Sequence, residues 1–196
     1  MIRTLRAIAV AGAAVAALAA CSSNDVKGTP TATPGGGTTT TAKGGSSGQP
    51  DLDLKKYLGA PCTILTPAQQ SELSTFREAK AEAEGIDGPT CTYQGKDSLA
   101  NSTFKVAFSV KGRTFEEGVS NSAAFSTFRE TKIAGYQAAV FDGADGKRNC
   151  NAAVRTSATE FVLIQATIGK NDKLNDGNAC GTAEQVAGTV VANLKG

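Results

Sequence analysis

The most regular hydrophobic pattern lies close to the C-terminus. Apolar residues recur there at intervals of three and four positions, a spacing that places side chains on one face of a helix. The residues of this apolar face are Ala183, Val186, Ala187, Val190, Val191 and Leu194. Thr182 and Gln185 are candidates for capping the start of the helix. The pattern predicts an amphipathic helix that packs its apolar face against the rest of the domain.

A different pattern, with alternation at every second residue, begins at residue 103. Four apolar side chains alternate there with polar or small ones, which is typical of a half-buried antiparallel strand. The apolar positions are Phe104, Val106, Phe108 and Val110, and the alternating positions are Thr103, Lys105, Ala107 and Ser109. Further strands are predicted at residues 90–94, 137–141, 151–156 and 161–168, with residues 157–159 closing a hairpin between the last two.

Two helix starts are marked by capping boxes, in which a Thr and a Gln or Glu three residues later each accept a hydrogen bond from the other's backbone N–H. Thr66 and Gln69 form one box, and Thr114 and Glu117 form the other. The first helix is expected to end near residue 85, with fraying after Phe76 as the alternative, and the second helix is expected to be short. The apolar side chains expected on the buried face of the first helix are Leu73, Phe76 and Ala83.

These elements predict the fold class. Their order is roughly α-β-β-α-β-β-β-α, and the strands are joined by hairpins more than by helical crossovers. Such an order favours an antiparallel sheet covered by helices over a doubly wound parallel sheet. We therefore predict a single α+β domain over residues 51–196.

The first 20 residues are typical of an export signal. Arg3 and Arg6 precede an apolar run over residues 7–17, which is shorter than the roughly 20 residues that a membrane-spanning helix needs. The run ends in residues 18–21, Leu-Ala-Ala-Cys, which resemble the lipobox of bacterial lipoproteins. This resemblance implies cleavage before Cys21 and attachment of palmitate-like acyl chains to Cys21. The alternative is an ordinary secretory signal in which Cys21 falls by chance.

Residues 21–50 are predicted to form a lipidated N-terminus followed by a disordered linker. The segment is rich in Thr, Gly, Ser and Pro and contains no aromatic residue. It cannot bury enough apolar surface to offset the entropy lost on ordering. We expect a spacer with an end-to-end distance of about 30 Å. The membrane, bound through Cys21, is then the first predicted partner, and the predicted location is the extracytoplasmic face of the cell membrane.

The amino-acid composition limits the catalytic and binding chemistry that the protein can use. The chain has no His, which excludes Ser-His-Asp hydrolysis, Cys-His proteolysis and His-ligated zinc. Without Arg3 and Arg6 the basic and acidic side chains are equal in number, 18 of each. A balanced charge with no basic block gives no reason to expect nucleic-acid binding. No cofactor motif is present, so none is predicted.

Four cysteines lie in the predicted domain: Cys62, Cys91, Cys150 and Cys180. An even number in an exported chain predicts two disulfides, with three possible pairings. The hairpin over residues 150–168 brings the chain back beside Cys150, close to Cys180, so we pair these two and, by elimination, Cys62 with Cys91. The alternative, a metal site of four thiolates, lacks the close C-x-x-C pairs that structural zinc favours, and no metal is predicted.

Several of these segments resemble the actinobacterial lipoproteins grouped as domain of unknown function 3558. The resembling segments are residues 61–68, 88–93 and 135–139, together with Cys150, the strand after it, and Cys180 ahead of the last helix. One departure is Tyr93, where the family often has Trp. The resemblance implies the cellular location and the fold. The family has no established activity, so no catalytic residue follows from it.

Two loops are rich in side-chain oxygens but match no ligand template. Residues 142–147 lack the EF-hand and P-loop spacings, and residues 171–178 follow no known spacing, so both are predicted to be polar turns. Neither the pair Glu82 and Glu84 nor the pair Glu116 and Glu117 is predicted to be a catalytic dyad, because helix positions this close do not face each other.

The sequence therefore supports three hypotheses about function. The leading one is a non-enzymatic binding module of the cell envelope that engages a small hydrophobic ligand, a wall component or an envelope protein. The second is an enzyme that uses carboxylate, Lys or Tyr chemistry, which a cleft gathering such groups would favour. The third is a partner of a co-secreted protein, which a broad exposed apolar patch would favour over a pocket.

Overall fold

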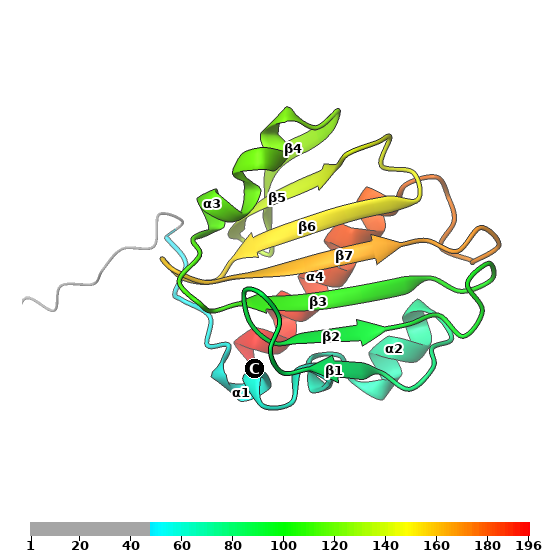
Figure 1. Cartoon of the computed structure of the whole chain (residues 1–196), viewed down its shortest axis with the longest axis horizontal. Coiled ribbons are helices and arrows are strands. Elements are labelled where there is room, and N and C mark those ends of the chain that lie inside the picture. Colours follow the sequence, from blue (N-terminus) through cyan, green and yellow to red (C-terminus); the bar gives the residue numbers. More distant parts are fainter. Residues whose placement is uncertain (1–47) are drawn as a thin grey trace, which may run out of the picture. The chain divides into compact units, whose positions relative to one another are not determined.

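A computed structural model of the chain describes residues 48–196. The predicted signal peptide, Cys21 and all but the last residues of the predicted linker lie outside the described residues. Within residues 48–196, seven strands form one antiparallel sheet in the order β1-β2-β3-β7-β6-β5-β4 (Figure 1). The strands are β1 (Lys80–Glu82), β2 (Thr90–Tyr93), β3 (Thr103–Ser109), β4 (Thr127–Ile133), β5 (Tyr136–Asp142), β6 (Asn149–Arg155) and β7 (Phe161–Thr167).

Helices cover the two faces of the sheet unequally. The helical elements are α1 (Lys55–Leu58), the 3-10 turn η1 (Pro61–Ile64), α2 (Pro67–Leu73), α3 (Phe115–Val119), the 3-10 turn η2 (Ser120–Ala124) and α4 (Ala179–Lys195). In Figure 1, α4 crosses behind the sheet, whereas α3 lies on the near side beside β4 and β5. The part of the near face over β2, β3 and the C-terminal half of β7 carries no helix. The predicted α+β class with an antiparallel sheet is confirmed.

The alternation predicted for β3 is confirmed, and it explains the two faces. Phe104, Val106 and Phe108 are fully buried against the α4 side of the sheet. They lie opposite Ala166, Ile164 and Val162 of β7, which point to the same side. A smaller cluster on the other face joins α3 to β5, β6 and β7 through Phe115, Val119, Ala139, Phe141, Ala153 and Phe161.

Both predicted capping boxes form. The hydroxyl of Thr66 accepts a hydrogen bond from Gln69 N at 3.3 Å, and Gln69 Oε1 accepts one from Thr66 N at 2.9 Å. Thr114 and Glu117 make the equivalent pair of bonds at 3.2 and 2.8 Å. The second helix is short, as expected, and buries Phe115 and Val119.

The prediction for the first helix was wrong beyond Leu73. Ser74 is already extended, and residues 80–82 form strand β1 instead of a fourth helical turn. The reason is tertiary packing. The ring of Phe76 packs against the rings of Tyr93 and Phe104, with centroid–centroid distances of 5.9 and 6.1 Å. Ala83, which the pattern placed on a buried face, is exposed.

Two further elements differ from the sequence prediction. Strand β4 was not predicted, because as an edge strand it exposes charged side chains and shows no clear apolar alternation. The last helix begins at Ala179, and its capping side chain is Asn178, whose Oδ1 accepts a hydrogen bond from Gly181 N at 2.9 Å. Thr182 and Gln185, the two residues predicted to cap it, both lie inside the helix.

The cysteines are bonded in the predicted pairs. Cys62 of η1 is joined to Cys91 of β2, and Cys150 of β6 is joined to Cys180 of α4, with a Cα–Cα distance of 4.9 Å in each pair. Each bond therefore fixes a helical element to the α4 side of the sheet.

Candidate functional site

A cavity of about 430 Å³ lies on the helix-free part of the near face. Its floor consists of three cross-strand pairs between β3 and β7, in which each residue of β3 lies directly opposite one of β7. These pairs are Lys105 with Gln165, Ala107 with Leu163, and Ser109 with Phe161. The floor is thus polar at the Lys105 end, apolar in the middle, and buried at the Ser109 end. We call this cavity the groove.

One wall of the groove is the loop of residues 83–89, which folds back over the near side of β3 (Figure 1). Backbone bonds hold it there: Val110 N donates to Asp87 O at 2.9 Å, and Phe108 N donates to Pro89 O at 3.0 Å. Gly88 has a φ of +145°, and a Cβ at this position would lie 2.2 Å from Phe108 O. The loop can approach β3 so closely because residue 88 is glycine.

The opposite wall is helix α3. A Cβ on Gly118 would lie 2.5 Å from the ring of Phe161, so the helix backbone rests almost directly on the floor of the groove. The ring of Phe115 meets the same Phe161 ring edge to face, with centroids 6.4 Å apart. These contacts make α3 a wall packed against the sheet by its own apolar cluster.

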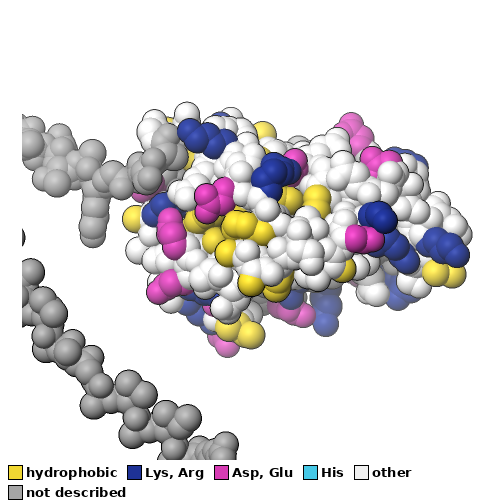
Figure 2. All heavy atoms as spheres, turned by 90° about the horizontal axis from the view of Figure 1, so that it is seen from above, with side chains coloured by type: hydrophobic (Ala, Val, Ile, Leu, Met, Phe, Trp, Pro, Cys, Tyr) yellow, Lys and Arg dark blue, Asp and Glu magenta, His cyan; other side chains and the backbone are white. Residues whose placement is uncertain are grey.

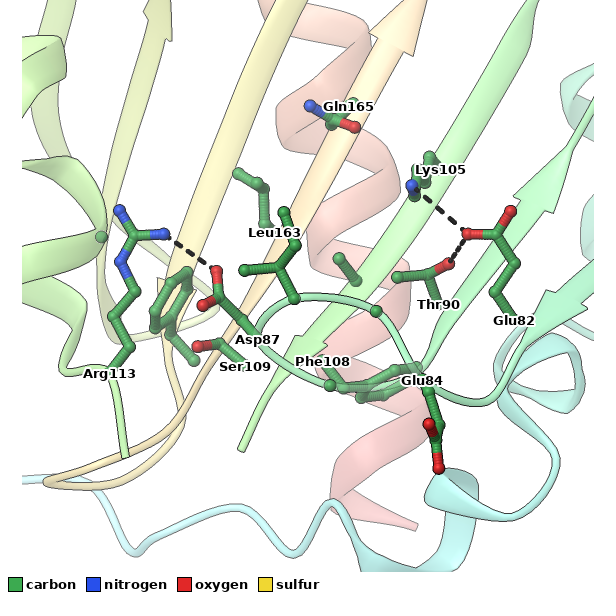
Figure 3. Close-up of a pocket in the computed structure, with 16 residues that line it drawn as sticks. Glu82, Glu84, Asp87, Thr90, Lys105, Phe108, Ser109, Arg113, Leu163 and Gln165 are labelled. Atoms are coloured by element: carbon green, nitrogen blue, oxygen red, sulfur yellow. Dashed lines mark hydrogen bonds and ion pairs between the residues drawn. The ribbon is translucent and has the colours of Figure 1, made fainter. Parts of the chain in front are cut away.

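Two ion pairs lie at the rim of the groove (Figure 3). Arg113 Nη1 lies 2.9 Å from Asp87 Oδ2 and so joins the segment before α3 to the 83–89 loop. Lys105 Nζ lies 3.8 Å from Glu82 Oε2 at the other end. Each cation is thus matched by a carboxylate, and Figure 3 shows Glu84 pointing away from the other labelled side chains. The charges that face the groove are therefore neutralised in pairs.

Ser109 has a buried hydroxyl that the fold leaves without a partner. The residue is 3% exposed and lines the groove, yet its Oγ has no hydrogen-bond partner among the described residues. Thr156, at 2% exposed, is in the same situation but lies outside the groove. Buried hydroxyls are normally hydrogen-bonded, so each of these two atoms calls for an explanation.

The residues that sequence analysis considered for ion binding have structural partners. Asp142 accepts hydrogen bonds from Ala144 N and Gly146 N at 3.0 and 3.1 Å, so the 142–147 loop is a polar turn closed by its own carboxylate. No group of three or more Cys, Asp or Glu side chains in residues 48–196 could hold a metal ion.

The acidic pairs also separate in the structure. Glu117 serves the cap of α3, and its hydrogen bonds with the backbone and hydroxyl of Thr114 lower the pKa of its carboxyl. Glu116 instead bonds Arg155 Nη1 at 2.8 Å. Glu82 lies at the groove, which the sequence did not reveal because residues 80–82 had been predicted as helix. The one sequence signal for the groove is the run of small residues, Ala107 and Ser109, on the outward side of β3.

Comparison with known proteins identifies the family. A family model described as a protein of unknown function, DUF3558, matches residues 16–193. The chain belongs to the DUF3558 family. Searches of curated proteins and of solved structures gave no significant match. The DUF3558 match covers the whole disulfide-bonded domain up to the last turn of α4.

Tyr93, which stands where DUF3558 proteins often have Trp, has a structural role. Its ring is fully buried, and its hydroxyl donates to Cys62 O at 2.9 Å and accepts from Leu65 N at 3.4 Å. Burial raises the pKa of Tyr93 to about 12. The neutral phenol therefore ties η1 to β2 beside the Cys62–Cys91 bond.

Proposed function

We propose that this DUF3558 protein is an actinobacterial lipoprotein, anchored at the outer face of the cell membrane through Cys21, whose domain binds a small, mostly apolar ligand in the groove. Two observations support the anchor. The family match begins at residue 16, so it includes the lipobox-like residues 18–21. The domain also carries two disulfides, which are characteristic of exported proteins.

The observation that carries the binding proposal is the groove itself. Its volume of about 430 Å³ falls within the range of about 300–1,000 Å³ typical of small-molecule sites. It combines an apolar middle with a few polar groups at its ends, which is the usual composition of such sites. The rim carboxylates are paired with cations and not with each other, which favours binding over acid–base catalysis.

The surface favours a small ligand over a broad protein interface. The large hydrophobic side chains that are exposed in residues 48–196 are Ile86, Leu99 and Phe125, which lie on three separate loops. Figure 2 views the molecule from the β4 edge of the sheet, which is the top of Figure 1. Both acidic and basic side chains are visible on this side, with hydrophobic side chains between them. Neither a wide apolar patch nor a field of one charge is present on that side.

The binding proposal is tested with diphenylhexatriene, an elongated hydrocarbon whose fluorescence rises in apolar surroundings. We expect saturable binding to the purified domain. Ala107→Phe should weaken it about tenfold or more, since loss of the central apolar contacts removes about 1.4 kcal/mol or more. Thr167→Phe is the matched control, because Thr167 is exposed on the same face of β7 outside the groove. Equal affinities in all three proteins, or no binding, would contradict the proposal.

The anchor is tested by fractionating cells that express the full chain. Cys21→Ala should move the protein from the membrane to the soluble extracytoplasmic fraction, because each buried acyl methylene contributes about 0.8 kcal/mol to membrane binding. Ser22→Ala is the control and should stay in the membrane fraction. If Cys21→Ala remained membrane-bound as firmly as the wild-type protein, Cys21 would not be the anchor.

A further inference from the structure

The unpartnered hydroxyl of Ser109 indicates which ligand chemistry the groove accepts at its buried end. Ser109 is the last residue of β3, and its side chain lies on the groove side of the strand by alternation with Phe108. Leaving a buried hydroxyl without a partner costs free energy in the empty protein. A ligand atom that formed this bond would remove the cost, so the hydroxyl favours a bound molecule with a hydrogen-bonding group at this point.

The charges around Ser109 restrict that group further. Asp87 and Arg113, which Figure 3 shows in the same part of the groove as Ser109, are already paired with each other, with Arg113 Nη1 2.9 Å from Asp87 Oδ2. A charged ligand group at the buried end would have no free counter-ion, and a buried charge without a partner is strongly disfavoured. The group that bonds Ser109 is therefore neutral, such as a hydroxyl or a carbonyl oxygen.

The floor sets the shape of the rest of the molecule. Ser109 and Lys105 lie four residues apart on β3, which corresponds to about 13 Å at about 3.3 Å per residue. Between them lie Ala107 and Leu163, which offer no hydrogen bonds. The bound molecule is therefore apolar along this length, and at the end opposite Ser109 it meets the polar side chains of Lys105 and Gln165.

We infer that the groove binds an uncharged amphiphile, with an alkyl or acyl chain along the Ala107–Leu163 floor and a neutral oxygen hydrogen-bonded to Ser109 Oγ. This inference rests on the proposed function, since it names the ligand class of the same groove. It adds a specific residue, Ser109, and a specific discrimination against charged ligands.

The test uses three probes of equal chain length, n-decanol, decanoate and decylammonium, each displacing diphenylhexatriene from the purified domain. Wild-type protein should bind decanol at least about tenfold more tightly than either ion, since each ion would lack a counter-charge. Ser109→Ala should weaken decanol binding by about two- to tenfold, as expected for one lost hydrogen bond. The affinity of the same variant for diphenylhexatriene is measured directly, so that its affinity for decanol can be calculated from the displacement curve.

Thr156→Val is the matched control, because it removes the other unpartnered buried hydroxyl, which lies outside the groove. It should leave the affinity for decanol unchanged. Neither variant should lower the melting temperature, since each removes a hydroxyl with no partner. If decanoate bound as tightly as decanol, or if Ser109→Ala left decanol binding unchanged while diphenylhexatriene still bound, the ligand class would be wrong. If diphenylhexatriene did not bind the wild-type protein, the proposed function itself would fail.

Discussion

The carboxylate of Asp172 joins three loops at one end of the sheet. Its Oδ2 accepts hydrogen bonds from Ser74 Oγ at 2.7 Å and from Ser102 N at 2.6 Å, and its Oδ1 accepts one from Leu174 N at 2.9 Å. Burial raises the pKa of Asp172, but the hydrogen bonds lower it by more, so the pKa lies below its ordinary value. The sequence marked this loop as a polar turn and gave no sign that one carboxylate in it would be buried.

Replacing this carboxylate should make the protein less stable near neutral pH. Asp172→Asn should lower the free energy of unfolding by about 1.5–3 kcal/mol, the usual value of hydrogen bonds to a charged group. Because the folded pKa is lowered, the stabilisation is present above the unfolded pKa of about 3.9 and is lost as the pH falls through the folded pKa. Thermal unfolding from pH 7 down to pH 3 should therefore show the gap between variant and wild type closing in acid.

The control for Asp172 is Asp176→Asn in the same loop. Asp176 is exposed, and its carboxylate accepts one hydrogen bond, from Asn178 N at 2.8 Å. This variant should change stability by no more than about 0.5 kcal/mol. A constant gap between Asp172→Asn and wild type across the pH range would show that the charge of Asp172 is not what stabilises the loops.

At the scale of elements, the 83–89 loop determines whether the groove has two walls. The loop lies on β3 through the carbonyls of Asp87 and Pro89, and it can do so because Gly88 has no side chain. A side chain at residue 88 would meet Phe108 O, so the loop would have to lift from the strand. A substitution that lifts this loop would therefore alter ligand binding without changing a residue of the floor.

Gly88→Ala should therefore both destabilise the domain and weaken binding. We expect a loss of about 1–3 kcal/mol in unfolding free energy from strained backbone, together with a lower affinity for diphenylhexatriene. Chemical denaturation and fluorescence titration measure the two effects. Gly59→Ala is the control, because Gly59 has open space around its Cβ position and a φ of −79°. Unchanged affinity in Gly88→Ala would show that the loop is not a wall of the binding site.

The sequence predicted elements best where local chemistry decides them. The hydroxyls of Thr66 and Thr114 fix two helix starts within a few residues, and the alternation of β3 depends on the burial of one face. It failed where distant contacts decide the structure. Helix α2 ends early because the ring of Phe76 packs against the rings of Tyr93 and Phe104. These two residues are distant in the sequence, so no local pattern around Phe76 predicts the contact.

At the scale of the whole molecule, the two disulfides hold separate helical elements to one face of the sheet. Their sequence separations are nearly equal, 29 residues for Cys62–Cys91 and 30 for Cys150–Cys180. Chain entropy therefore predicts nearly equal stabilisation, about 3–4 kcal/mol each. Replacing either pair by Ala should lower the free energy of unfolding by this amount, as measured by urea denaturation. If both double variants were as stable as the wild type, the cross-links would not stabilise the fold.

The groove was not predictable from the sequence, although its parts were. The sequence predicts strands over residues 103–110 and 161–168, but nothing local pairs β3 with β7 or places Lys105 opposite Gln165. Only the start of the 83–89 loop falls within the predicted first helix, and its close approach to β3 is not predicted. The second wall depends on Gly118 resting on Phe161. The groove depends on strand register and on close approach of backbone segments, and both become visible only in the folded sheet.

Native mass spectrometry of the protein purified from its own membrane detects processing, lipidation, disulfides and bound ligand in a single measurement. We expect a polypeptide that begins at Cys21, carries covalent lipid, lacks the four hydrogens lost in two disulfides, and retains a neutral ligand that the Ala107→Phe variant does not retain. A chain that begins at Met1, with free thiols and without lipid or bound ligand, would contradict this expectation.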